Sequence, residues 1–339
     1  MILKLFKQSY LLQYAMLFFL AILLWFPAFV NPPELEISNQ PYISPLWHLV
    51  SGILAGYPMT GVVIAFLLTL TGALFINAIL DKYDLVPKNT LIPAALYIIM
   101  MSHQPDYLQL HPETIAAFLM LIVLFSLFDI YTQHEAYNQV FNTGFLSGIA
   151  SLFFFPSALF LLFIYLTFFA YRLYTWREWF IALSGFLINW FFLASYYFLF
   201  DKITDAYISY SVFSIITSDI SSFHLSDVVT NIISGLVVVF FMYAASMLAL
   251  HLQENVISVR KRFVSVFWFI FISLIMSLLF KDALLQGFRF LLVGIVIFVS
   301  WAILKSKNRI WFEWFIWILI LFIVGNNIYQ IMIERYFYA

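Results

Sequence analysis

The chain has 339 residues, of which 64% are hydrophobic and only 10% are charged, and its formal net charge is −1. A water-soluble domain is nearer half apolar and a quarter charged, so this composition excludes an ordinary soluble protein and predicts helices that face lipid. The near-zero charge argues against a nucleic-acid partner. The absence of cysteine excludes disulfides, thiolate metal sites and a cysteine nucleophile.

The first thirty residues, MILKLFKQSYLLQYAMLFFLAILLWFPAFV, place two lysines before a long apolar run. This run is longer than the apolar core of a signal peptide, and no small-x-small cleavage site follows it. We therefore interpret the segment as a retained first membrane span.

The rest of the chain repeats this pattern of apolar runs between short polar interruptions, with no long soluble insertion. A helix needs roughly 20 apolar residues to cross the hydrocarbon core. The sequence predicts an all-α, polytopic transmembrane protein, folded as a single domain over residues 1–339. Its candidate spans, about eleven in number, lie near 11–30, 57–80, 89–102, 112–131, 140–154, 156–173, 179–200, 228–250, 263–280, 286–304 and 311–331.

Basic residues are unevenly divided between the two ends of these spans. Cytoplasmic loops of membrane proteins carry an excess of lysine and arginine. With a cytoplasmic N-terminus, four basic residues fall on the far side: Lys202, Lys281, Arg289 and Arg335. Twelve fall on the cytoplasmic side: Lys4, Lys7, Lys82, Lys88, Arg172, Arg177, Arg260, Lys261, Arg262, Lys305, Lys307 and Arg309. This asymmetry predicts a cytoplasmic N-terminus and an outer C-terminus.

The predicted outer side collects most of the acidic residues and histidines. The first outer loop has Glu34 and Glu36, and the stretch HQPDYLQLHPET supplies His103, Asp106, His111 and Glu113. One interpretation is that positive-inside sorting leaves acids outside by default, and that Glu113 after Pro112 favours a helix N-terminus. The other is a polar outer cavity for a cation, a divalent metal ion or a phosphate-sugar group.

The stretch NTGFLSGIASLFFFPSALFLLF has Gly144 and Gly148 four residues apart and a proline at 156. Small residues at this spacing allow helices to approach closely in lipid. We expect a helical hairpin that breaks at Pro156 and packs closely through the two glycines.

The layout of residues 1–200 resembles the membrane half of the C-type (GT-C-like) glycosyltransferases, which use a lipid-linked sugar outside the cytoplasmic membrane. The resemblance lies in a single span before an acidic outer loop, a helix start at HPETIAAFLML, and the glycine-rich hairpin GFLSGIASLFFFPSALFLLF. Residues 201–339 would then be additional C-terminal helices. The chain also resembles a family of uncharacterised inner-membrane proteins of Bacteroidota, through the stretch YRLYTWREWFIALSGFL.

The resemblance implies roles for the outer residues. Glu34 and Glu36 would be the acidic pair, with one acting as the base for the acceptor, and Glu113 would match the acid at the helix start. His103, Asp106 and His111 would contact a polyprenyl-phosphate-linked sugar, with or without a divalent metal ion. The chain departs from the family in having Glu-x-Glu where aspartate is usual and in lacking an outer soluble domain. A non-catalytic subunit of a cell-envelope complex in the bacterial inner membrane is therefore the alternative expectation.

Overall fold

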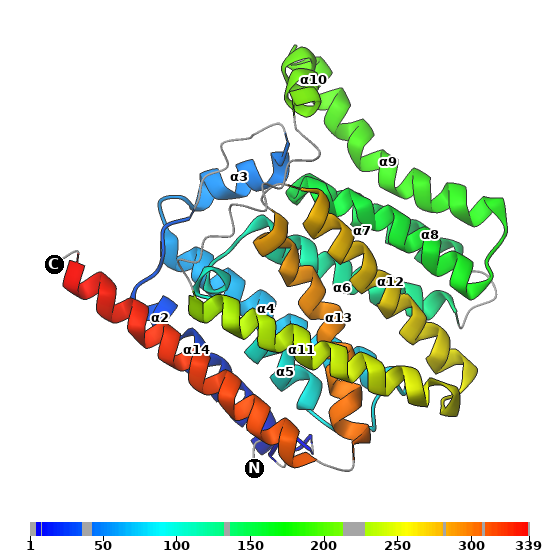
Figure 1. The fold of residues 1–339 in the computed structure, drawn as a ribbon. Helices are drawn as coiled ribbons and strands as arrows, with labels where there is room; N and C mark the ends of the chain where they lie inside the picture. Colours follow the sequence, from blue (N-terminus) through cyan, green and yellow to red (C-terminus); the bar gives the residue numbers. More distant parts are fainter. Residues whose placement is uncertain are drawn as a thin grey trace.

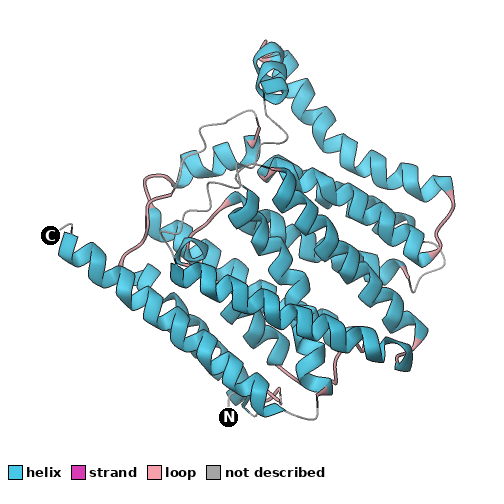
Figure 2. Cartoon of the chain, viewed as in Figure 1, coloured by secondary structure: helices cyan, strands magenta, loops and turns pink. Residues whose placement is uncertain are grey.

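The computed structural model describes residues 5–7, 9–35, 43–131, 136–212, 228–280, 283–306 and 309–337, and all regular structure in these ranges is helical (Figures 1 and 2). The α-helices are α2 (Leu11–Val30), α3 (Pro45–Leu54), α4 (Pro58–Lys82), α5 (Ile92–Met101), α6 (Pro112–Ile130), α7 (Tyr137–Phe153), α8 (Phe160–Tyr171), α9 (Trp176–Leu199), α10 (Ile203–Val212), α11 (Val228–His251), α12 (Ile257–Leu279), α13 (Ala283–Lys305) and α14 (Arg309–Phe337). Short 3-10 helices occupy η1 (Pro105–Leu108), η2 (Phe155–Leu159) and η5 (Leu252–Glu254). The predicted all-α class is confirmed.

Proline marks the start of several elements. Pro45, Pro58, Pro93 and Pro112 lie in the first turn of α3, α4, α5 and α6. Proline suits this position because the first backbone N–H groups of a helix have no partner within the helix. Pro156 opens η2 between α7 and α8, so the break predicted there is present.

Seven helices in the described ranges are long and apolar enough to cross a membrane, rather than the eleven expected from the sequence: α2, α4, α6, α9, Ser234–Glu254, α12 and the Phe288–Lys305 part of α13. Three other candidates form the shorter helices α5, α7 and α8, and 311–331 lies within α14, of which only the stretch Trp311–Asn326 is counted, among the shorter apolar helices. The segment 89–102 contains only the ten-residue α5, which at 1.5 Å per residue is about 15 Å long, half the thickness of the hydrocarbon core. The helix α3 was not predicted, because its residues were assigned to an outer loop.

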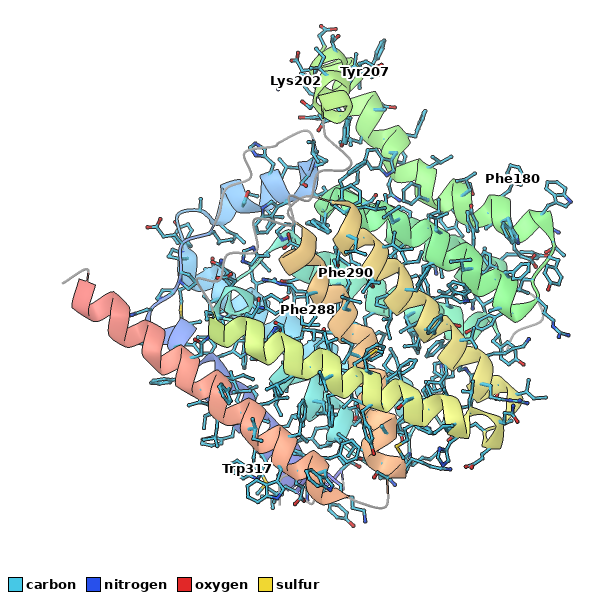
Figure 3. All side chains as sticks on the ribbon, in the orientation of Figure 1. Phe180, Lys202, Tyr207, Phe288, Phe290 and Trp317 are labelled. Carbon is cyan, nitrogen blue, oxygen red and sulfur yellow. The ribbon has the colours of Figure 1, made fainter. Side chains whose placement is uncertain are left out.

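The helix α13 lies at the centre of the bundle and is the most enclosed of the candidate spans. It packs against α5, α6, α11 and α12, and all ten residues of α5 are buried. Two flanks border this centre (Figure 1). On one, α14 packs against α2, and on the other α9 contacts the bundle mainly through α7. Phe180 on α9 and Trp317 on α14 project outward from these flanks, as lipid-facing aromatic side chains do (Figure 3).

The predicted close approach of Gly144 and Gly148 is confirmed, and the neighbouring helix is α9. A Cβ atom at Gly148 would lie 2.8 Å from the Phe186 carbonyl oxygen, and one at Gly144 would overlap the backbone of Ala182. Asn189 of α9 donates from Nδ2 to the Phe145 carbonyl oxygen of α7 at 3.0 Å. Backbone contact and an interhelical hydrogen bond thus hold α9 to the bundle.

A polar cluster closes one end of the bundle, where α4 and α6 end and α12 begins. Asp129 accepts hydrogen bonds from Lys82 Nζ at 2.9 Å and from the Tyr83 hydroxyl at 2.6 Å. Arg262 is buried, with its guanidinium carbon 4.4 Å from the Tyr83 ring centroid. Its Nη1 donates to the Tyr83 carbonyl oxygen at 3.4 Å. These contacts join α12 to the first part of the chain.

Replacing Gly148 with leucine should destabilise the protein, because the new side chain must displace the backbone of α9. We expect a loss of about 1–3 kcal/mol, as overpacking usually costs, measured by thermal unfolding of the purified protein in detergent. The matched control is Gly235→Leu in α11, where a Cβ meets no atom within 4 Å. Equal losses in both variants would contradict the close α7–α9 packing.

Candidate functional site

The segment from Ser102 to Thr114 forms a compact polar turn between α5 and α6. Trp25 donates from Nε1 to the Ser102 hydroxyl at 3.0 Å, and that hydroxyl donates to the Ile98 carbonyl oxygen at 2.7 Å. These bonds fix the end of α5 against α2. Pro105 then opens η1, and Pro112 starts α6. Both termini of the turn are therefore anchored to helices.

Arg289 of α13 enters this turn and organises it. Its side chain is only 4% exposed. Nη2 donates to the Asp106 carbonyl oxygen at 2.8 Å, Nη1 donates to the Thr114 hydroxyl, and the guanidinium carbon lies 4.2 Å from the Tyr107 ring centroid. A buried cation loses its contacts with water. Here the tyrosine ring and the two oxygen atoms that accept its hydrogen bonds replace part of those contacts. Arg289 thus connects η1, the first turn of α6 and α13.

His103 is buried beside Arg289 and is held in its neutral form. Its Nδ1 lies 2.7 Å from the Met100 carbonyl oxygen, so Nδ1 carries the proton and Nε2 is left as an acceptor. The Ser234 hydroxyl of α11 lies 3.5 Å from Nε2, and Gln104 donates to that hydroxyl at 3.3 Å. Burial, reinforced by the positive charge of Arg289, lowers the pKa of His103 to about 4.

His111 occupies the N-cap position of α6 and is also neutral at physiological pH. Burial is the main cause, and Arg289 adds to it, so that the pKa of His111 is lowered to about 3. Both histidines therefore contribute hydrogen-bonding groups to the turn but no positive charge. The positive charge on this side of the turn belongs to Arg289.

Among the predicted acidic residues, Glu113 is the one placed inside the turn. It is 2% exposed and sits in the first turn of α6, where the helix dipole favours a carboxylate. Asp106 contributes its backbone carbonyl to Arg289, while its side chain is exposed. The acidic residue and the two histidines predicted for one site thus do lie in one compact turn.

Glu34 lies near this end of the bundle but is not part of the buried turn. The neighbouring Leu35 packs on Gly61 near the start of α4, and η1 also contacts α4. The side chain of Glu34 is exposed. Glu36 lies outside the described residues, so the predicted pairing of these two carboxylates stays a prediction.

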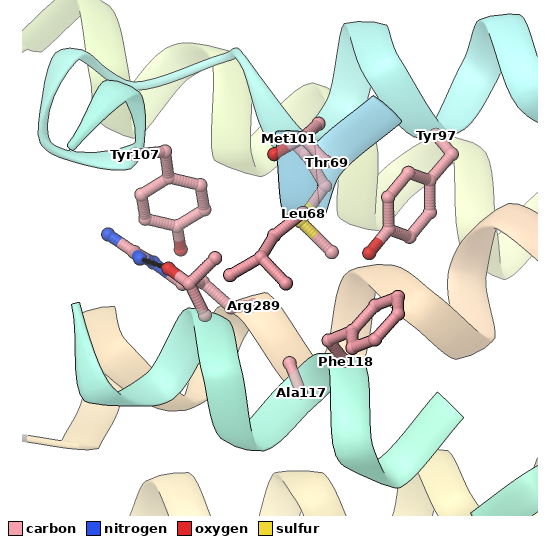
Figure 4. Close-up of a pocket in the computed structure, with 9 residues that line it drawn as sticks. Leu68, Thr69, Tyr97, Met101, Tyr107, Ala117, Phe118 and Arg289 are labelled. Atoms are coloured by element: carbon pink, nitrogen blue, oxygen red, sulfur yellow. Dashed lines mark hydrogen bonds between the residues drawn. The ribbon is translucent and has the colours of Figure 1, made fainter. Parts of the chain in front are cut away.

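A small cavity lies beside Arg289, between α4, α5, α6 and α13 (Figure 4). The cavity has a volume of about 10 Å³. This is room for roughly one water molecule. Hydroxyl-bearing side chains and Arg289 alternate with apolar ones around it. The lining residues are Leu68, Thr69, Tyr97, Met101, Tyr107, Thr114, Ala117, Phe118 and Arg289.

Within the described ranges, no three histidine, aspartate or glutamate side chains converge in an arrangement that could hold a metal ion. The chain matches no protein-family model, curated protein or solved structure.

Arg289 is the site residue that sequence reasoning missed. It is one of the few basic residues on the predicted outer side, but nothing in the sequence connects it with the turn, which lies about half the chain length before it. A usable signal was its position, because it interrupts an apolar run of α13, LLQGFRFLLVGIVIF. A charge inside such a run usually faces the interior of the bundle.

Acid should destabilise the fold through His103. Its pKa is lowered from 6.5 to about 4 in the folded chain, so the unfolded chain binds the proton first as the pH falls. The stability is complete above pH 6.5 and falls between pH 6.5 and 4, by up to about 1.4 kcal/mol per pH unit for one such group. His103→Asn keeps a donor for the Met100 carbonyl and should reduce this slope, measured by unfolding in detergent at several pH values. An unchanged slope would contradict a buried, neutral His103.

Proposed function

We propose that this polytopic membrane protein is glycosyltransferase-like and acts on a polyprenyl-phosphate-linked sugar at the periplasmic face of a bacterial inner membrane. The observation that carries the proposal is the burial of Glu113 in the turn that also holds His103 and His111 and that Arg289 of α13 enters. Buried ionisable groups that share one turn are uncommon in lipid-facing proteins and are concentrated at functional sites.

In this proposal Glu113 is the general base. It accepts the proton of an acceptor hydroxyl as the acceptor oxygen bonds to the anomeric carbon and the bond from that carbon to the lipid phosphate breaks. Glu34 and Glu36, from the first outer loop, are the second acidic group of the site. The side chain of Asp106 and the two histidines supply polar contacts to the sugar.

The proposed orientation puts the 102–114 turn outside the cytoplasm. The orientation rests on the uneven division of basic residues between the two sides, and the separation of the charged groups along α6 supports a crossing by that helix. Thr114 and Asp129 lie about 23 Å apart at the helical rise of 1.5 Å per residue, with Arg289 at one end and Lys82 at the other. The proposal also keeps eleven membrane crossings. In it, the shorter helices combine with other segments to make crossings that none of them makes alone.

Substitution of the two carboxylates tests the catalytic role. Glu113→Gln keeps the shape and removes the charge, and we expect a loss of about 10²–10⁴-fold in transfer, the usual contribution of a general base. Glu34→Gln and the double variant show whether both act in one site, because a shared site gives no further loss in the double variant. Function in cells is compared at matched protein level, with Glu254→Gln, which removes a surface ion pair with Lys305, as the control.

Full function in all three carboxylate variants would favour the second candidate, a non-catalytic subunit of a cell-envelope complex. One observation favours that candidate. The cavity beside Arg289 has room for roughly one water molecule, which is far too small for a sugar.

Reporter fusions test the orientation separately. A reporter that is active only outside the cytoplasm should work when fused after Ala339 and fail when inserted at Asn255, between η5 and α12. The expectation rests on the basic residues around Arg260 to Arg262, which anchor that loop in the cytoplasm. The reverse pattern at either position would remove the proposed orientation.

A further inference from the structure

The guanidinium of Arg289 forms part of the cavity wall. The described residues do not accept hydrogen bonds from all of its nitrogen atoms. The Nε atom of Arg289 is buried and has no hydrogen-bond partner among the described residues, although both Nη atoms do. No ion pair to Arg289 is present in the part of the chain that the structure describes. A buried charge is costly unless it is both hydrogen-bonded and paired with an opposite charge.

The remaining polar atoms of the cavity are suited to an anion. Tyr97, Tyr107 and Thr114 bring hydroxyl groups to the wall, and Thr114 lies in the first turn of α6, where backbone N–H groups favour negative charge. Figure 4 shows the Tyr97 hydroxyl directed into the space between Leu68 and Phe118. Donors therefore surround a volume that a single oxygen atom would fill.

On the side of α4 and α6 the cavity lies close to the surface of the bundle. Three of its lining residues are only half-buried, namely Leu68 on α4 and Thr114 and Phe118 on α6, and these mark its mouth. The adjacent face of α4 carries exposed Ile64 and Leu67, which face lipid. Thr114 is in the first turn of α6, close to the end of the membrane span, where phospholipid headgroups lie.

We infer that the Arg289 cavity binds one anionic oxygen of a phosphate headgroup that approaches between α4 and α6. The oxygen accepts from Arg289 Nε and the neighbouring hydroxyls, and the rest of the phosphate stays at the mouth, because the cavity has room for only one atom of that size. This inference goes beyond the proposed function. It requires no sugar transfer, and Glu113 does not line the cavity.

The test measures binding through thermal unfolding of the purified protein in detergent, followed by its own tryptophan fluorescence. The probes are dihexanoyl phosphatidic acid, dihexanoyl glycerol with the same chains but no phosphate, inorganic phosphate, and sodium chloride. Because a ligand that binds only the folded state stabilises it, the phosphatidic acid should raise the unfolding midpoint saturably. The glycerol lipid and chloride should not.

Three variants locate the effect. Arg289→Gln removes the charge, Tyr97→Phe removes one hydroxyl, and Ala117→Val fills the cavity while leaving every polar group in place. Each should weaken the apparent affinity, by about ten-fold or more for Arg289→Gln, since a hydrogen bond to a charged group is lost. The control is Tyr171→Phe, which removes a buried hydroxyl bonded to Ser265, on the opposite end of the bundle. If Arg289→Gln does not fold, the other two variants still decide the question.

Stabilisation by inorganic phosphate with the same dependence on Arg289 would support the phosphate site and assign its ligand to the solvent. No stabilisation by either phosphate probe, equal stabilisation of wild type and the three variants, or an equal effect of chloride would overturn the inference. Glu113→Gln should bind the phosphate probes as wild type does. Full function of Glu113→Gln with binding intact would count against the proposed function alone. Loss of its function while the wild type binds neither phosphate probe would count against this site alone.

Discussion

The fold depends on the burial of two arginines, one near each end of the bundle, that must be satisfied without water. Arg262 lies over Tyr83 and Arg289 over Tyr107, at 4.4 Å and 4.2 Å from the ring centroids. Each guanidinium also donates to a backbone carbonyl in a segment that the chain produced long before. Because unsatisfied polar groups cost several kcal/mol in lipid, these contacts are strong constraints. They fix α12 and α13 against the segments that follow α4 and α5.

The same constraint shapes the polar turn. Burial keeps His103 and His111 neutral, and the nearby Arg289 makes a second positive charge still less favourable, so both act through their hydrogen bonds. Glu113 introduces negative charge at a helix N-terminus, where it is best tolerated. The turn is therefore a region of opposed charges enclosed by neutral donors and acceptors. Such a region suits either chemistry on a polar group or the retention of an anionic lipid.

Local patterns in the sequence predicted most of the helices. Apolar runs located the long spans, Pro112 and Pro156 marked a helix start and a break, and Gly144 with Gly148 indicated close packing. Each of these signals depends on residues within a few turns of one another. The helix α3 was missed because its ten residues are too few for a span, so they were assigned to the outer loop.

The site was predictable only where its residues are close in sequence. His103, His111 and Glu113 are neighbours in the sequence, and the structure places them in one turn. Arg289 belongs to the same turn only through the packing of α13 on α5 and α6, which no local pattern encodes. The position of Glu34 depends in the same way on how the first outer segment lies against α4. Its exposed side chain is what a glutamate in a proline-rich loop usually shows.

The short helix α5 has a consequence for how the protein enters the membrane. At about half the hydrocarbon thickness, it is poorly suited to being released into lipid as an independent span, so it must insert together with α4 and α6. One of its faces is covered by α13, which the ribosome makes only after seven further α-helices, α6 to α12. Until then, α5 has an uncovered side in the nascent protein. Biogenesis of this chain thus includes a late step in which α13 fills a space held open by helices that inserted long before it.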